Sequence, residues 1–361
     1  MSQTTSQLER PRILTGDTPT GALHLGHWVG SLENRVRLQD EYECYFLLAN
    51  MHAFTTRADT PGDIRRDTIE IVCDWLAAGI DPERSCVVLQ TEVPAIAELS
   101  WFFAMLLPFN RVMRNPTLKT EIDSKGLGDK YSFGFPMYAV GQCADILAFR
   151  PVCVPVGEDQ VAHIEMCREV ARRFNQMYCG VDPKTEDADY PGAGGLFPIP
   201  QALVGRVARL VGVDGVQKMS KSLGNAVLLS DDPKTVKKKI NRIFTGRQSP
   251  TEPGDTSNAL FQWVEAFVPD AGRVAELKDK YARGADIGDG HIKAEVADCV
   301  NALLEPMRER RKAFEGEAGE RKVIEIIRDG TARANAVAEE TLWNAKRSMG
   351  LDFFARDLRA R

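Results

Sequence analysis

Two short stretches of this 361-residue sequence combine cations or hydrogen-bond donors with glycines. The first, HLGH, places His24 and His27 three residues apart, which is one face of a helix. The second, KMSKS, lies within the segment Asp214–Asn225 and carries Lys218 and Lys221. Imidazoles at the positive end of a helix can donate to phosphate oxygens, and lysines on a glycine-flanked loop can close over a polyphosphate. These residue types therefore predict chemistry on the phosphates of a nucleotide.

Each stretch also has a simpler explanation. The pair in HLGH could lie on the surface or bind zinc, although His52, His163 and His291 lack zinc-like spacing to it. A loop rich in lysine and serine is most often only solvated surface. The sequence lacks both the Walker pattern and the G-x-G-x-x-G fingerprint. It is the occurrence of both stretches, in this order and on a suitable fold, that favours the phosphate-binding interpretation.

The first two hundred residues alternate between strand and helix patterns. Apolar runs typical of buried strands occupy 12–16, 44–51, 85–90 and 153–157. Helical spacing is found at 24–39, 65–79 and 159–175. This alternation predicts an α/β fold with a Rossmann-type doubly wound parallel sheet, forming a catalytic domain over residues 10–226 that includes the KMSKS loop. Ligands of such sheets bind beyond the carboxyl ends of the strands, where HLGH follows the first strand.

The strand signals disappear after residue 231. The remaining segments all carry helical spacing, which predicts a second, all-helical domain over residues 227–361. Its last helix could pack back on the catalytic domain.

Composition limits the partners and the location. The net charge of −5 gives no global basic field, so DNA is not an expected partner. The eight cysteines are scattered and form no C-x-x-C, which is typical of reduced thiols in a cytoplasmic protein. The apolar runs are too short for a membrane span, and the first residues are polar. We therefore expect a cytoplasmic protein with no membrane association.

A polar stripe on an otherwise apolar helix predicts a binding pocket. Tyr138, Gln142 and Asp145 follow at i, i+4 and i+7, which is one helix face, and the strand at 153–157 comes next. The flanking residues are too apolar for a solvent-facing stripe. A buried carboxylate without a donor is costly, so Asp145 would select a ligand that carries one.

H-x-G-H followed by K-M-S-K-S is the signature pair of the class I aminoacyl-tRNA synthetases. The segments 38–57, 76–94, 144–175 and 290–304 are similar, in the same order, to those of the tryptophanyl-tRNA synthetases, and the similarity runs from about Arg12 to the C-terminus. The resemblance implies that L-tryptophan is activated with ATP and transferred to the terminal adenosine of tRNA(Trp). It also implies a homodimer, and Mg²⁺ carried by ATP rather than by a metal site of the protein.

The resemblance assigns roles to individual residues. The catalytic group would be His24, His27, Lys218 and Lys221. The ATP-binding group would be Thr18, Gly26, Lys119, Asp159, Met219 and Ser220. The substrate-binding group would be Leu14, His52, Tyr138, Gln142, Asp145, Val154, Val156 and Gln160.

The tyrosyl-tRNA synthetases are the near alternative. Y-x-x-x-Q-x-x-D is the pattern of those enzymes, and many bacterial tryptophanyl enzymes have methionine where Gln142 stands. A tyrosine hydroxyl donates as an indole N–H does, so Asp145 cannot separate the two substrates. Tyrosyl enzymes place a phenol in the first strand where this sequence has Leu14, an apolar wall for a larger ring. Tryptophan is therefore the preferred substrate.

Two other functions and two possible contact surfaces are also considered. A small-molecule nucleotidyltransferase would be shorter, whereas a duplicate synthetase with a binding or regulatory role remains open. The basic patch is a solvated face or, by the resemblance, a contact for tRNA; it comprises Lys234, Lys237, Lys238, Lys239 and Arg242. The segment from Leu99 to Asn115 would suit a dimer interface or a buried helix, with Trp101, Phe102, Phe103 and Leu106 as its apolar residues.

Overall fold

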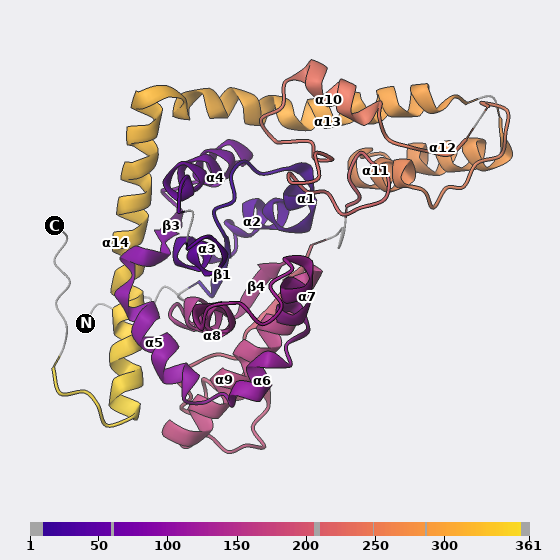
Figure 1. Ribbon diagram of the computed structural model, residues 1–361. Helices are drawn as coiled ribbons and strands as arrows, with labels where there is room; N and C mark the ends of the chain where they lie inside the picture. The colour runs from indigo at the N-terminus through magenta and orange to yellow at the C-terminus, as the bar shows by residue number, and fades with distance from the viewer. Residues whose placement is uncertain (1–9, 59–60, 206–209, 248, 286, 355–361) are drawn as a thin grey trace, which may run out of the picture.

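The computed structural model describes residues 10–58, 61–205, 210–247, 249–285 and 287–354. Within these ranges five parallel strands form one sheet in the order β3-β2-β1-β4-β5 (Figure 1). The strands are β1 (Arg12–Asp17), β2 (Glu43–Leu48), β3 (Ser85–Leu89), β4 (Cys153–Val156) and β5 (Gln201–Val204). The predicted Rossmann-type doubly wound sheet is confirmed. The sequence patterns missed β5, which is only four residues long and follows a Gly/Pro-rich loop.

The two faces of the sheet support separate hydrophobic cores. Ile13 and Phe46 belong to one core, whereas Leu14 and Tyr45 belong to the other. This division arises because successive side chains of a strand point to opposite faces. Both faces are buried, which explains why the strands read as nearly continuous apolar runs.

Helices and short helical turns cover both faces. The first predicted helix forms in three parts, because a π-helical turn interrupts it: α1 (Leu25–His27), η1 (Trp28–Leu32) and α2 (Glu33–Leu38). The others in this part of the chain are α3 (Asn50–Arg57), α4 (Ile64–Ala78), η2 (Gln90–Glu92), α5 (Pro94–Ala104), α6 (Phe109–Met113), α7 (Pro116–Ser124), α8 (Gly134–Leu147), η3 (Glu158–Gln160), α9 (Val161–Tyr178) and η4 (Asp187–Asp189). Single π turns are frequent at functional sites, and this one follows HLGH directly.

The rest of the described chain is helical. It consists of α10 (Pro233–Ile240), α11 (Ala259–Phe267), α12 (Ala271–Arg283), α13 (Asp289–Arg311), η5 (Lys312–Phe314) and α14 (Gly316–Ser348). Helices α10 to α13 form a lobe to one side of the sheet (Figure 1). Val236, Ile240 and Ile243 of the basic segment are buried. The last seven residues of the chain lie outside the described ranges.

Helix α14 covers the edge of the sheet that β3 forms. It runs beside β3, where the hydroxyl of Thr331 accepts from the Leu89 N–H at 3.0 Å (Figure 1). Arg333 donates to the Ser85 carbonyl at 2.9 Å. An uncovered edge strand offers unpaired N–H and C=O groups, so these bonds replace a neighbouring strand. Gly330 allows the close approach of the helix, since an added Cβ would lie 2.7 Å from the Val87 nitrogen.

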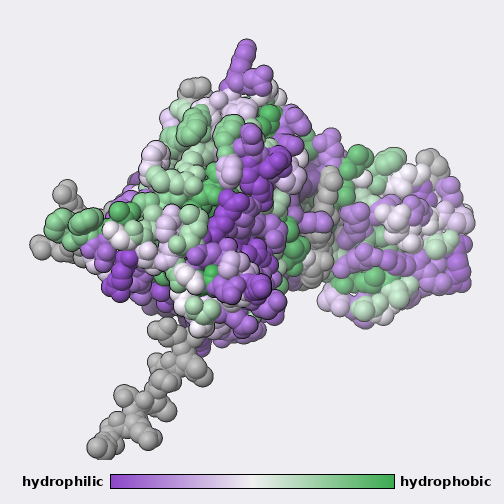
Figure 2. Space-filling view, turned by 90° about the horizontal axis from the view of Figure 1, so that it is seen from below, coloured by the Kyte–Doolittle hydropathy of each residue, from purple (hydrophilic) through white to green (hydrophobic). Residues whose placement is uncertain are grey.

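The surface combines hydrophilic bands with apolar areas on the body that carries the sheet (Figure 2). Trp101, Met105 and Phe109 are 63%, 67% and 61% exposed. Phe103 and Leu106 are instead buried in the chain's own core, because they lie on the opposite side of this segment. Of the two expectations for this segment, a buried helix is therefore the correct one for Phe103 and Leu106.

Composition predicted reduced cysteines and no membrane span. All eight cysteines lie in the described ranges and are free thiols. No helix in the described part of the chain has both the length and the apolar character needed to span a bilayer.

Replacing Gly330 with alanine tests the packing of α14. We expect Gly330→Ala to lower the free energy of unfolding by about 1–3 kcal/mol, because the added methyl group meets the backbone of β3. This loss outweighs the usual gain of about 1 kcal/mol for alanine in a helix. In the control Gly290→Ala, at the start of α13, no atom lies within 4 Å of the added Cβ. Denaturation by urea compares the two variants, and equal stabilities would contradict the packing argument.

Candidate active site

The candidate site lies where the strand order reverses. Strands β2 and β3 lie on one side of β1, and β4 and β5 lie on the other. The chain segments that leave β1 and β4 therefore separate at their carboxyl ends, which is where such sheets bind ligands. HLGH follows β1, and the segment 157–160 follows β4. Between the two strands, the Thr15 hydroxyl donates to the carbonyl of Pro155 at 2.5 Å. Pro155 itself has no backbone N–H to donate.

The two predicted motifs meet in space although about 190 residues separate them. The N–H of Gly26 in HLGH donates to the sulfur of Met219 in KMSKS at 3.4 Å. The Leu25 N–H donates to the Val227 carbonyl at 2.9 Å, and the Leu229 N–H donates to the Leu23 carbonyl at 3.0 Å. The chain after the KMSKS loop thus pairs with the chain that carries the histidines.

Lys221 lies against the loop that joins β1 to HLGH. Its ammonium donates to the carbonyls of Thr20 at 2.7 Å and Ala22 at 2.8 Å. Arg57 of α3 donates to Pro19 of the same loop. Burial lowers the pKa of Lys221, while nearby carboxylates such as Asp67 oppose that shift. Cations from two elements therefore hold this loop by its carbonyl groups.

The KMSKS loop is held by Asn225 at its end. The Asn225 side-chain oxygen accepts from the Ser220 N–H at 2.7 Å, and its nitrogen donates to Asp214 at 2.7 Å. Asn225 is buried, and Gly212 leaves the room for its side chain. The loop, which sequence reasoning treated as mobile, thus has an internal polar scaffold in this structure.

The other residues predicted to bind ATP lie around this loop or farther out. Lys218 faces the Asp159 carboxylate at 3.6 Å, and both side chains are more than half exposed. Ser220 bonds to a neighbouring serine hydroxyl. Thr18 is exposed, and Lys119 is exposed on α7, whose Thr117 hydroxyl donates to the carbonyl of Asp159 at 2.8 Å. The structure therefore brings Lys218 to Asp159 but leaves Thr18 and Lys119 at the rim.

Both histidines of HLGH are neutral at physiological pH. The pKa of His24 is lowered to about 2 and that of His27 to about 4, mainly by burial and in smaller part by the nearby Lys218 and Lys221. The two rings lie 3.7 Å apart between centroids. The His27 Nδ1 accepts from the His24 backbone N–H at 3.1 Å, so the proton of His27 is on Nε2. The Nδ1 of His24 is buried without a hydrogen-bond partner, which is costly unless a ligand supplies one.

Asp145 lies at the centre of a buried polar cluster. Gln90 donates to its Oδ1 at 2.7 Å, and the His52 Nδ1 faces its Oδ2 at 3.5 Å. Burial raises the pKa of Asp145 to about 7, and the bond from Gln90 opposes the shift. Burial lowers the pKa of His52 to about 4. His52 and Asp145, both predicted to bind the substrate, thus lie together, and Gln90, which the sequence patterns did not indicate, contacts both of them.

The rest of the polar stripe also finds partners. The Tyr138 hydroxyl lies 3.3 Å from the Nε2 of His163, and Gln142 donates to Gln160 at 3.3 Å. The apolar residues expected to surround the ligand, Leu14, Val154 and Val156, are buried in the same core as α8. All eight residues predicted to bind the substrate therefore come from one face of the sheet or from its carboxyl edge.

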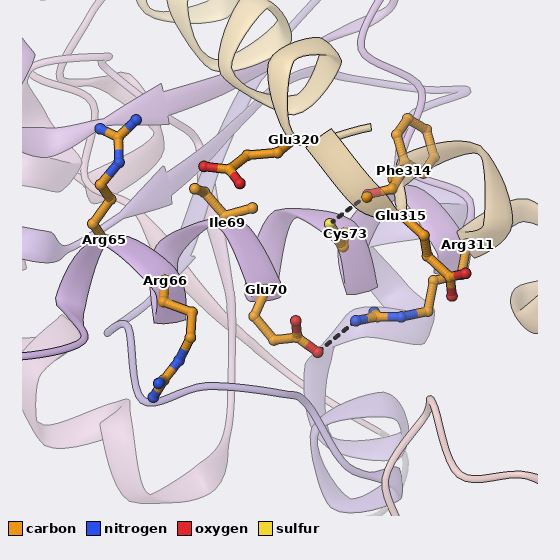
Figure 3. Close-up of a pocket in the computed structure, with 10 residues that line it drawn as sticks. Arg65, Arg66, Ile69, Glu70, Cys73, Arg311, Phe314, Glu315 and Glu320 are labelled. Atoms are coloured by element: carbon orange, nitrogen blue, oxygen red, sulfur yellow. Dashed lines mark hydrogen bonds and ion pairs between the residues drawn. The ribbon is translucent and has the colours of Figure 1, made fainter. Parts of the chain in front are cut away.

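A contact chain leads from the helical lobe to HLGH. A cavity of about 420 Å³ lies between α4 and the junction of α13 with α14. Arg311, which lines this cavity, reaches Glu70, as Figure 3 shows, and also bonds to Asp74. The other oxygen of Asp74 accepts from the Leu23 N–H at 2.6 Å, one residue before His24. None of the predicted site residues lines the cavity, so it is separate from the site.

Sequence reasoning missed Gln90, Asp74, Arg57 and the scaffold role of Asn225. The position of Gln90 directly after a buried strand was a usable signal, since ligand-contacting groups gather there. Asp74 and Arg57 carry no such signal, because their contacts to the loop before HLGH are with backbone groups that are distant in sequence.

Comparison with known proteins agrees with this geometry. The family model of the class I tRNA synthetases (W and Y) matches residues 6–305. The tryptophan–tRNA ligase of Treponema pallidum is 41% identical, covering 94% of this chain and 97% of that protein. The enzyme of the same name from Lactococcus lactis is 40% identical, covering 96% of this chain and 100% of that protein.

A solved structure extends the similarity to three dimensions. The tryptophanyl-tRNA synthetase of Campylobacter jejuni, complexed with ADP and tryptophan, superposes with a TM-score of 0.76. It is 31% identical and covers 94% of this chain and 100% of that one. With its two signature motifs in contact at the switch point of the sheet, this chain belongs to the class I tRNA synthetases of the tryptophan and tyrosine family.

Proposed function

We propose that this protein is a tryptophan–tRNA ligase, which activates L-tryptophan with ATP and transfers it to the terminal adenosine of tRNA(Trp). The observation that carries the proposal is the contact between the two motifs, Met219 against Gly26, which places Lys221 beside HLGH. The relatives that are similar over nearly their full length are tryptophan–tRNA ligases, which favours tryptophan over tyrosine.

The activation step needs charge neutralisation rather than a protein nucleophile. The tryptophan carboxylate attacks the α-phosphorus of ATP, and the bond to pyrophosphate breaks. His27 can donate from Nε2 to a phosphate oxygen without adding charge, because it is neutral. Lys218 and Lys221 supply the positive charge for the leaving pyrophosphate. Lys221 would exchange its two carbonyl partners for phosphate oxygens, which are stronger acceptors because they are charged.

Recognition of the amino acid would rest on Asp145 and on the apolar residues beside it. Asp145 would accept the indole N–H, and Leu14, Val154 and Val156 would contact the ring. Tyr138 and Gln160 would hold the α-amino group. Leu14, which is buried, provides no hydroxyl for a tyrosine substrate.

Magnesium would enter with ATP. Among the described residues, no group of three or more His, Cys, Asp or Glu side chains could hold a metal ion. Mg²⁺ prefers oxygen ligands and keeps several waters, so the phosphate oxygens of ATP are its natural ligands. The protein's own contribution there remains the positions of Lys218, Lys221 and the two histidines.

The proposed partners follow from two surfaces. Lys234, Lys237, Lys238 and Arg242 are exposed on and after α10, at the base of the helical lobe, and would contact tRNA phosphates. Lys239 is instead paired with Asp231. The exposed Trp101, Met105 and Phe109 would lie in a homodimer interface. A cytoplasmic location stays a prediction.

Amino-acid-dependent ATP–pyrophosphate exchange tests the proposed function. We expect exchange with tryptophan and none with tyrosine or phenylalanine. Phenylalanine lacks a ring donor for Asp145, and such sites reject a ligand without one by about 10⁴–10⁵. Exchange with tyrosine would mean that Gln142 decides the substrate rather than Leu14. Folded protein that supports no exchange would favour a duplicate synthetase with a binding role.

A second test concerns the charge of Lys221. Lys221→Gln keeps a donor for the carbonyls of Thr20 and Ala22 but removes the cation. We expect kcat of exchange to fall on the order of 10²–10³, with a smaller change in the KM for ATP. The matched control is Lys184→Gln, which changes an exposed lysine of another loop and should leave both constants unchanged. A wild-type kcat in Lys221→Gln would refute the assignment.

The third test uses the pKa of Asp145, which is raised to about 7. The ionised form is the better acceptor, so kcat/KM for tryptophan should rise as the pH increases through about 7 and then level off. Asp145→Asn should abolish this rise and lower the plateau roughly 10- to 100-fold, the loss expected for a hydrogen bond to a charged group. The measurement is exchange between about pH 5.5 and 8.5. A rise that persists in Asp145→Asn would assign the titration to another group.

A further inference from the structure

The orientation of the Gln90 amide is fixed by backbone donors. Gln90 is 1% exposed, and its Oε1 accepts from the N–H groups of Met51 at 3.0 Å and His52 at 3.3 Å. Backbone N–H groups can only donate, so the atom that faces them must be the amide oxygen. The amide nitrogen therefore points the other way, toward His52 and Asp145.

This orientation determines the tautomer of His52. The Gln90 Nε2 lies 2.7 Å from the Asp145 Oδ1 and 3.1 Å from the His52 Nε2. Both contacts use hydrogens of the amide, so the His52 Nε2 must be an acceptor. A neutral imidazole then carries its proton on Nδ1, which faces the Asp145 Oδ2 at 3.5 Å. Gly141 makes room for this arrangement, since an added Cβ would lie 2.8 Å from the His52 Nε2.

The network leaves Asp145 as an acceptor toward the ligand. Each of its oxygens faces one donor from the protein, and each keeps a further lone pair. The donors come from η2 and α3, which follow β3 and β2, whereas Asp145 comes from α8. Residues from three elements thus meet at the Asp145 carboxylate. Gln90 is the one that contacts both Asp145 and His52.

We propose that Gln90 is a positioning residue for side-chain selection: its amide sets the tautomer of His52 and the orientation of Asp145, and so makes the pocket select a ligand ring that donates a hydrogen bond. The part of this inference that concerns the substrate rests on the proposed function. The part that concerns His52 does not, because it follows from the hydrogen bonds of the protein alone.

The tautomer of His52 can be measured directly. In Gln90→Glu, one carboxylate oxygen can still accept from the N–H groups of Met51 and His52, while the other replaces a donor with an acceptor. We expect nitrogen-15 NMR of labelled histidine to show His52 protonated on Nδ1 alone in the wild-type protein, whereas in the variant, where a carboxylate oxygen faces Nε2, that nitrogen also carries a proton. A His52 that stays protonated on Nδ1 alone in Gln90→Glu would overturn the proposal.

Substrate selection is measured with Gln90→Met, which is similar in length but has no amide donor. The probes are tryptophan and its benzothienyl analogue, in which sulfur replaces the ring N–H. We expect the preference for tryptophan, as a ratio of kcat/KM in exchange, to fall roughly 10-fold with little change for the analogue. Equal losses for both substrates, or an unchanged ratio, would overturn the role in selection.

The matched control is Gln39→Met. Gln39 is also buried, but its amide donates to the carbonyls of Val36 and Gly79, away from the pocket. This variant should lose stability and keep both the His52 tautomer and the preference for tryptophan. If the wild-type protein activates neither probe while the protonation of His52 changes as expected in Gln90→Glu, the proposed function fails and the positioning of His52 stands.

Discussion

The backbone pairing between residues 23–25 and 227–229 is the constraint on which the proposed phosphate site depends. Its two hydrogen bonds, Leu25 to Val227 and Leu229 to Leu23, join the chain after β1 to the chain after the KMSKS loop. His24 lies inside the first segment, and Lys221 precedes the second by only a few residues. Asp74 accepts from the remaining Leu23 N–H and connects this point to Arg311 at the end of α13. The helical lobe begins with α10 at Pro233, a few residues after this pairing, so the lobe and the segment that holds the histidines are joined both along the chain and through Asp74.

Burial gives the histidines and the lysines of the proposed phosphate site different electrostatic properties. Removal from water lowers the pKa values of both histidines, so they remain neutral and act only as hydrogen-bond donors or acceptors. Lys218 stays at the surface, where a hydrated ammonium costs little to keep charged. Lys221 lies between these extremes, and the carbonyls of Thr20 and Ala22 compensate for its lost water. Positive charge therefore resides on the loop that can exchange partners, and the fixed helix end contributes uncharged donors.

The sequence predicted those parts of the fold whose signals are local. Four strands, the long helices and both motifs follow from apolar periodicity and residue type within single segments. Strand β5 was missed because four half-exposed residues carry too little pattern. The sequence could not decide between a dimer face and the core for Phe103 and Leu106, because an apolar segment does not reveal which of its sides faces inward. Gln90 was missed because its partners Met51, His52 and Asp145 are distant in sequence, and only the packing of α3 against α8 brings them together.

The two halves of the site solve opposite physical problems. The phosphate half keeps polar groups without permanent partners, such as the buried Nδ1 of His24, and this cost is recovered only when a ligand supplies the missing bond. The proposed amino-acid site is already hydrogen-bonded without a ligand, since the Gln90 amide contacts both His52 and Asp145. In the proposed function, a preformed acceptor would reject a wrong ring at binding, whereas buried polar groups without partners would favour a state in which the ligand supplies the missing bond. Selection and rate enhancement can therefore be assigned to different residues on the same carboxyl edge of the sheet.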